Sequence, residues 1–323
     1  MQNLNISLTG PTRLVYEDIY QVFIKNYQNL ISQFLEFQFS WLQQAYLTMN
    51  DLDKYNILVY LYKKNFVSLS EIFKFKSFNE FYFNPRFNLE KINVIEISKE
   101  LRISKETSRR KILELQKDGI LIKDKKTITV TLKAGLLQKP NNTISSFSKI
   151  LSNISYFLYK EKKVKKFYDK EFFEKKIKDR FTQVLGIFLD YQLDYLITRK
   201  IITENDMELF FIFGTMIYNQ NIYLKKNNIT AEYRDEWWEF LTRVGDKKGL
   251  NAMTISDLTG IPRPTVIRKL KIMLKNKDVY KDKSNLYLFI KGKMFRDMNK
   301  LRLKNIERLS STISKINNII FFS

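Results

Sequence analysis

Two segments of the chain carry residue types that read base edges in DNA, spaced as on one exposed face of a helix. An arginine fork can form two hydrogen bonds with guanine, a glutamate can accept one from cytosine, and an apolar side chain can contact the thymine methyl group. A helix of this kind fits the major groove. The sequence therefore predicts two base-contacting sets: Lys105, Glu106, Arg109 and Arg110 in the first segment, and Arg263, Thr265, Ile267 and Arg268 in the second.

Each basic segment is followed by two short stretches of β-branched or aromatic residues that flank a lysine-rich tip. This pattern predicts a two-stranded hairpin, or wing, with its tip at residues 123–126 in the first copy and 281–284 in the second. Lysines at such tips contact phosphates, which adds affinity and salt dependence without sequence information. We expect this role for Lys123, Lys125, Lys126, Lys281 and Lys283.

The elements that would hold these side chains occur twice in the sequence. The order of residue types in residues 97–112 recurs in residues 255–270: an apolar helix, a tight turn, and the helix that carries the basic face. Ser104 is placed to cap the first basic helix. The inward stripe of each basic helix is predicted to be small or apolar: Ser108, Ile112 and Leu115 in the first copy, Val266 and Leu270 in the second.

The repeat extends beyond this unit, because residues 34–42 match residues 188–196 at a spacing of about 154. We infer that a whole domain was duplicated, giving units 1–163 and 164–323. The charge run at residues 162–166 is interpreted as a solvated helix that joins the copies. Two further pairs of segments match in the same order: residues 50–53 with 205–208, and residues 128–135, predicted to close the wing as a strand, with 286–292.

Helical periodicity predicts a long, aromatic-rich first helix in each copy, over residues 16–47 and 171–202. Each is apolar on more than one side, so it must bury two faces. Asp51 and Asp206 are placed to cap the second helix of each copy. Helices are also expected over two later segments, residues 143–160 and 294–320.

Inserts before the basic helices differ between the copies. Residues 66–91 are predicted to be irregular or partly stranded, and residues 222–250 to contain a short helix anchored by Trp237 and Trp238. The predicted fold class is thus mainly α with small β wings. It consists of two winged helix-turn-helix domains plus long dimerisation-type helices, an intramolecular pseudo-dimer.

Composition supports a polyanionic partner and argues against most catalysis. The 323 residues include 56 Lys+Arg and 34 Asp+Glu, a net charge of +22 that attracts nucleic acid. The absence of cysteine and histidine excludes zinc ribbons, disulfides and imidazole catalysis. No glycine-rich phosphate motif is present. We therefore expect no enzyme activity, no catalytic residues, no metal and no cofactor. Acids that could suggest a metal site are interpreted as belonging to helix caps: Asp51, Asp53, Asp206 and Glu208.

Location is predicted to be cytoplasmic and nucleoid-associated, without a membrane partner. The first ten residues lack the basic start and apolar centre of a secretory signal. The most apolar run, residues 210–218, falls short of the roughly 20 residues that span a bilayer.

Each copy resembles the MarR family of bacterial transcription regulators. The resemblance rests on the order of elements: long helix, second helix after an acidic turn, helix-turn-helix, wing, a segment ending at Gly135 or Gly292, and terminal helix. It implies that the first and last helices form the dimer interface and that two winged lobes sit on successive major grooves. Neither predicted wing tip reproduces the Asp-x-Arg element of that family, and both inserts are longer than the family's.

Three function classes follow from these observations. The first is a sequence-specific transcription regulator that binds double-stranded DNA as a single chain, with RNA polymerase as a further partner. The second is a plasmid-type replication initiator, which also carries two winged-helix domains in one chain. The third is a helical scaffold whose winged domains bind protein and not DNA.

Overall fold

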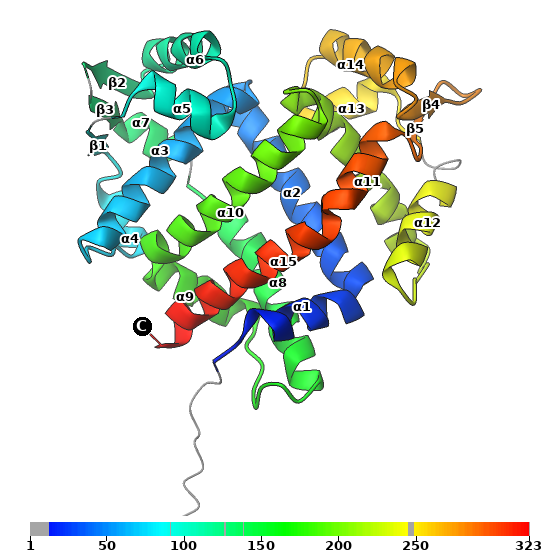
Figure 1. The fold of residues 1–323 in the computed structure, drawn as a ribbon, viewed down its shortest axis with the longest axis horizontal. Coiled ribbons are helices and arrows are strands. Elements are labelled where there is room, and N and C mark those ends of the chain that lie inside the picture. Colours follow the sequence, from blue (N-terminus) through cyan, green and yellow to red (C-terminus); the bar gives the residue numbers. More distant parts are fainter. Residues whose placement is uncertain (1–12, 91, 126, 138, 245–248, 323) are drawn as a thin grey trace, which may run out of the picture.

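The computed structural model describes residues 13–90, 92–125, 127–137, 139–244 and 249–322. It is mainly helical, with two small antiparallel sheets (Figure 1). The first half contains α1 (Tyr16–Lys25), α2 (Tyr27–Met49), α3 (Leu52–Glu71), α4 (Phe78–Phe83), β1 (Phe87–Leu89), α5 (Val94–Leu101), α6 (Lys105–Lys117), β2 (Leu121–Asp124), β3 (Thr127–Val130), α7 (Leu132–Leu137) and α8 (Asn141–Lys160). The second half contains α9 (Lys170–Asp179), α10 (Phe181–Ile202), α11 (Met207–Lys226), α12 (Arg234–Val244), α13 (Ala252–Thr259), α14 (Arg263–Lys275), β4 (Val279–Lys281), β5 (Tyr287–Phe289) and α15 (Lys293–Phe322). None of the helices in these ranges combines the length and the apolar character needed to cross a membrane.

Each predicted long first helix is broken near its start. The break falls at Asn26 between α1 and α2, and at Arg180 between α9 and α10, with nearly the same backbone angles: φ −108°, ψ 37° and φ −110°, ψ 33°. The prediction of continuous helices over residues 16–47 and 171–202 was therefore wrong at equivalent places. Neither residue is glycine or proline. The short helices turn because they pack elsewhere, α1 against α8 and α15, and α9 against α8.

The long helices α2 and α10 cross at the centre of the molecule (Figure 1). At the crossing, the amides of Gln38 and Gln192 bond to each other reciprocally, each Nε2 donating to the other Oε1 at 2.9 Å. Both side chains are buried. These residues are 154 positions apart, which is the spacing of the sequence repeat. Equivalent residues therefore face each other across a pseudo-two-fold axis.

Aromatic packing around the crossing follows the same pseudo-symmetry. Phe34 on α2 meets the ring of Tyr195 on α10 edge-on, at 5.4 Å between centroids. Phe188, the equivalent of Phe34, meets Trp41, the equivalent of Tyr195, at 5.8 Å. Such a self-complementary arrangement is what two copies related by a two-fold axis must produce.

The two halves exchange packing partners. Helix α10 lies along α3 of the first half, and α2 lies along α11 of the second. At the ends of these contacts, Lys200 on α10 binds Asp53 on α3 at 2.6 Å, and Tyr46 on α2 donates to Glu208 on α11 at 3.2 Å. Helix α3 of the first half is thus covered by the long helix α10, and helix α11 of the second half is covered by the long helix α2.

The connection between the halves is not helical, so the predicted joining helix at residues 162–166 was wrong. Helix α8 ends at Lys160, and residues 161–169 form turns and coil. Lys163 binds Asp18 at 2.9 Å, and Val164 packs against the core. The boundary between units 1–163 and 164–323 falls in this coil, and the division stays a prediction about the chain's origin.

A two-stranded hairpin follows each basic helix. Strands β2 and β3 pair antiparallel, as do β4 and β5. In the first half β1 adds a third strand beside β3, and in the second half a single bridge between Leu250 and Tyr287 takes its place. The predicted strand ending at Gly135 was wrong in part, because β3 stops at Val130 and α7 follows.

The inserts are more helical than their composition suggested. Helix α3 continues to Glu71, so it takes in the start of the insert at residues 66–91, and α4 follows behind a capping box of Ser77 and Glu80. The stretches 72–77 and 84–86, which have no helix or strand, and the strand β1 match the prediction of an irregular or partly stranded insert. In the second half α12 confirms the predicted short helix: Trp237 is fully buried, and Trp238 Nε1 donates to the Tyr27 hydroxyl at 3.0 Å.

Candidate nucleic-acid interface

The first basic helix, α6, is held to α5 by a tight turn. Arg102 ends α5 in the left-handed conformation, at φ 48°. The Ser98 hydroxyl donates to the carbonyl of Ile103 at 2.7 Å and closes the turn. Ser104 then caps α6 as predicted, accepting from the backbone N–H of Thr107 at 3.0 Å.

The second pair, α13 and α14, is built in the same way. Gly260 takes the left-handed position, at φ 75°, and the Ser256 hydroxyl donates to the carbonyl of Ile261 at 2.7 Å. Pro262 takes the capping position without a side-chain hydrogen bond. The predicted inward stripes are also confirmed, since Ser108, Ile112, Leu115, Val266 and Leu270 are all buried.

A buried lysine ties each basic helix to the start of another helix in its own half: α6 to α3, and α14 to α11. Lys111 on α6 bonds to Asp51 at 2.6 Å and to Glu114 at 3.0 Å. Burial opposes the charge of Lys111, but these carboxylates outweigh it and raise the pKa of the ammonium. In the second half Lys269 on α14 bonds to Asp206 in the same way. The basic helices are therefore fixed at their inner faces.

The acidic residues serve these contacts and the helix caps. Asp51 and Asp206 accept from backbone N–H groups at the starts of α3 and α11, which confirms the predicted caps. Asp53 binds Lys200, and Glu208 accepts from Tyr46. Within the described ranges, no cluster of three or more acids is arranged to hold a metal ion.

The residues predicted to contact bases lie on the outer sides of α6 and α14. On α6, all four are exposed: Lys105, Glu106, Arg109 and Arg110. On α14, Arg263 and Arg268 are exposed, whereas Thr265 and Ile267 are partly buried.

Ion pairs among these side chains are weak. Arg109 and Glu106 approach no closer than 4.0 Å, and Arg110 and Glu114 are also 4.0 Å apart. Solvent-exposed pairs at this distance contribute little free energy. The guanidinium groups can therefore leave these partners for a phosphate or a base without much cost.

The hairpin lysines are placed at or near the tips. Lys125, Lys281 and Lys283 are exposed and Lys123 is half-buried; Lys126 lies outside the described residues. Lys281 also lies over the ring of Tyr287, at 5.7 Å from its centroid.

Figure 1 shows α6 and α14 on the same edge of the molecule, at its two ends, with the hairpins β2–β3 and β4–β5 on the outer sides. The helices that carry the predicted residues therefore lie at two separate places on the same edge of the molecule. The crossed helices α2 and α10 connect them.

Sequence reasoning did not identify the residues that orient the basic helices. Lys111 and Lys269 occupy equivalent positions in the matching segments, as do Ser98 and Ser256. Identity at these positions was not a sufficient signal, because the exposed Arg110 and Arg268 match each other as well.

Comparisons of this chain with protein-family models, with curated proteins and with solved structures found no match.

Proposed function

We propose that this chain is a sequence-specific, double-stranded DNA-binding regulator of transcription that acts as an intramolecular pseudo-dimer. In this proposal each half is a MarR-like winged helix-turn-helix unit, α5–α6 or α13–α14 with the hairpin that follows. The basic helices enter two major grooves on one face of the duplex, about one turn or roughly 34 Å apart. The lysines of the hairpins contact the backbone.

The observation that carries the proposal is the duplication of the basic helix on one edge of an interlocked body (Figure 1). One basic helix is commonly only a solvated surface. Two equivalent ones, each tied by a buried lysine to the aspartate that caps a neighbouring helix (Asp51 of α3 or Asp206 of α11), require a shared reason for lying on the same edge. A duplex supplies that reason, since its grooves repeat along one face. The net charge of +22 favours such a partner.

The geometry also supports an inverted repeat over direct repeats. The Gln38–Gln192 pair relates the halves by a two-fold operation, and a two-fold protein matches a two-fold operator. Because outward residues of α6 and α14 differ at matching positions, such as Arg109 and Ile267, the two half-sites should differ in sequence. A replication initiator would instead favour direct repeats.

Selection of bound fragments from random duplex DNA, at two salt concentrations, tests this proposal. We expect one imperfect inverted repeat. Arg109→Ala should relax base preference in one half-site and Arg268→Ala in the other, each by about 1–3 kcal/mol at the affected base pair. Lys117→Ala removes the same charge from the far end of α6 and serves as the control.

Removing the described hairpin lysines together should instead weaken binding to every sequence and reduce the salt dependence. Enrichment of direct repeats would favour the initiator. Absence of any complex with duplex DNA at low salt would favour a protein-binding scaffold.

A further inference from the structure

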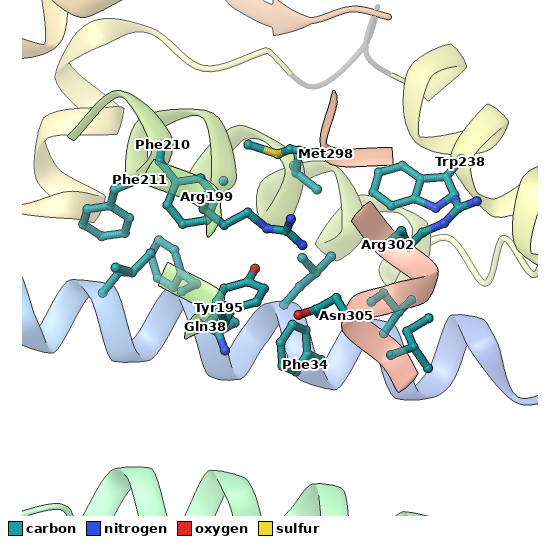
Figure 2. Close-up of a pocket in the computed structure, with 17 residues that line it drawn as sticks. Phe34, Gln38, Tyr195, Arg199, Phe210, Phe211, Trp238, Met298, Arg302 and Asn305 are labelled. Carbon is teal, nitrogen blue, oxygen red and sulfur yellow. The ribbon is translucent and has the colours of Figure 1, made fainter. Parts of the chain in front are cut away.

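The turn that follows α3 presents three apolar side chains to solvent, and we call them the apolar knob. Ile72, Phe73 and Phe75 are 58%, 82% and 40% exposed, and the two phenylalanine rings meet edge-on at 6.4 Å between centroids. Aromatic rings beside the helix crossing, such as Phe34 and Phe210, are enclosed instead (Figure 2). Neighbouring apolar side chains that stay in water mark a surface for interaction.

The second half contains the same turn with a polar surface. In both turns two backbone hydrogen bonds close the end of the helix. The donor and acceptor residues are Phe73–Ser70 and Lys74–Leu69 in the first half, and Asn228–Lys225 and Ile229–Leu224 in the second. The knob positions 72, 73 and 75 therefore correspond to Asn227, Asn228 and Thr230, which are all exposed. The duplicated chain thus supplies its own comparison: one fold of the turn, with an apolar and a polar version.

Phe73 is unfavourable to its own chain in two respects. Its backbone is left-handed, at φ 53°, and Asn228 has nearly the same angle, φ 52°. This conformation after a helix suits glycine or asparagine and disfavours a bulky side chain. The ring also lies in water, so it contributes little burial to folding. Since the fold gains nothing from Phe73 that Asn228 does not provide, a contact outside the chain accounts for this ring.

The charges of the knob narrow the partner. Lys74 is exposed and Lys76 is half-buried, and neither forms an ion pair with any residue that the structure describes. A surface that fits the knob therefore needs an apolar recess and carboxylates beside it.

Such a recess lies next to the knob on the same chain, between the start of α4 and α9. It encloses about 820 Å³, much of it open to solvent, and Phe78 contributes an apolar wall. Its charged lining consists of Glu171, Glu174, Asp179, Lys175 and Lys178. This is an excess of carboxylates in a chain whose net charge is +22.

Two of these carboxylates are available to a partner. Glu174 is bonded to Lys170 at 3.1 Å, whereas Glu171 and Asp179 are exposed and have no ion pair in the described part of the chain. The recess begins at Ser77, four residues after Phe73, so the two Cα atoms are at most about 14 Å apart. Knob and recess are therefore neighbours.

We propose that two copies of this chain associate through this surface, with the knob of each chain in the recess of the other. Because knob and recess are neighbours, one two-fold axis between two chains forms both contacts at once. Lys74 and Lys76 of each chain then meet Glu171 and Asp179 of its partner. An interface of this kind closes at two chains.

The contact leaves the candidate nucleic-acid interface uncovered. Figure 1 shows α4 and α9 away from the edge that holds α6 and α14. The pair of chains thus carries four basic helices, and its association does not require DNA. The knob is small, so we expect a weak dimer with a dissociation constant on the order of 100 µM.

Sedimentation velocity of the full chain, from about 1 µM to about 300 µM, measures this association. Salt near 0.15 M leaves only charges within about 8 Å strongly coupled, so the repulsion between two basic chains is reduced. Phe73→Asn copies Asn228 and should weaken dimerisation at least about tenfold, because a central aromatic anchor is lost. Met253→Asn replaces a residue of α13 that is 50% exposed, and this control should dimerise as the parent does.

Thermal unfolding at about 1 µM, where the parent is a monomer, separates this role from a structural one. Phe73→Asn should melt at or above the temperature of the parent, because asparagine is the better residue for the left-handed position.

A charge exchange tests the pairing itself. Lys74→Glu/Lys76→Glu makes the knob acidic, and Glu171→Lys/Asp179→Lys makes the recess basic. Each double variant alone should stay monomeric, because like charges then meet at both contacts. An equimolar mixture, with one variant fluorescently labelled, should form dimers that contain one chain of each, because both contacts again join opposite charges.

The proposal is overturned if the parent is monomeric throughout this range or forms species larger than a dimer. It is also overturned if Phe73→Asn dimerises as the parent does or melts below it, or if the mixture of folded charge variants forms no dimer. A monomeric parent would leave the knob to a different protein.

Discussion

The buried glutamine pair at the helix crossing gives a sharp prediction about how the halves are joined. Gln38 and Gln192 exchange two hydrogen bonds of 2.9 Å in the core. Replacing Gln38 with leucine removes both bonds and leaves the donor and the acceptor of Gln192 buried. Each buried group left unsatisfied costs about 1–3 kcal/mol, and the added apolar burial offsets part of that cost. We expect the free energy of unfolding to fall by about 2–3 kcal/mol.

The double variant Gln38→Leu/Gln192→Leu should recover most of this loss. When both partners of a buried polar pair become apolar residues of similar size, no unsatisfied group remains. Its stability should be within about 1 kcal/mol of the parent, which implies a coupling of more than about 2 kcal/mol between the two sites.

Urea unfolding followed by tryptophan fluorescence measures these quantities, with Gln21→Leu on the exposed face of α1 as the control. The reasoning is refuted if the effects of the two single substitutions simply add in the double variant. It is also refuted if Gln38→Leu alone is as stable as the control, because the pair would then contribute nothing at the crossing.

Three further predictions concern the local geometry. Ser104→Ala removes the cap of α6 and should lower the free energy of unfolding by about 0.5–2 kcal/mol, measured in urea. Lys111→Met leaves Asp51 partly buried without its ion pair and should cost about 1–2 kcal/mol, a value reduced by the partial exposure of the carboxylate. Burial raises the pKa of Asp278 although the Met294 N–H donates to it at 2.7 Å. Because the folded pKa is raised, the contribution of Asp278 to the free energy of unfolding is lost as pH rises through the folded pKa. The free energy of unfolding of Asp278→Asn, measured in urea and compared with that of the parent, should therefore be relatively higher at pH 7 than at pH 4.

Local features of the fold could be predicted because short-range rules decide them. Asp51, Asp206 and Ser104 cap the helices assigned to them, since a side chain that can accept from the first turn sits where each helix must begin. Inward stripes such as Val266 and Leu270 followed from helical periodicity.

Long-range features could not be predicted, because no single segment contains them. The breaks at Asn26 and Arg180 lack glycine or proline and arise from packing of α1 on the distant helices α8 and α15, and of α9 back on the preceding helix α8. Packing of α10 on α3 and of α2 on α11 depends on which surfaces these helices contact in the folded chain, and no short segment determines that. The repeat alone is compatible with two separate domains, whereas contacts such as Lys200 with Asp53 interlock them.

The candidate interface divides in the same way. Exposure of Arg109 and Arg268 follows from the inward stripe of each helix, because what is not buried must face out. The buried partners Lys111 and Lys269 were not foreseen, because a lysine on a basic helix is ordinarily solvent-facing. Only the contact with the caps of α3 and α11 reveals their role.

Spacing dependence of DNA binding tests the central claim most directly. Once the two half-sites are known, their separation can be varied in single base-pair steps and the affinity and stoichiometry measured for each duplex. One interlocked body that carries both α6 and α14 predicts one chain per duplex and tight binding only near a centre-to-centre separation of about 10 base pairs, with a steep loss when about 5 base pairs are added. Equal affinity at every spacing, or two chains on each inverted repeat, would contradict the account.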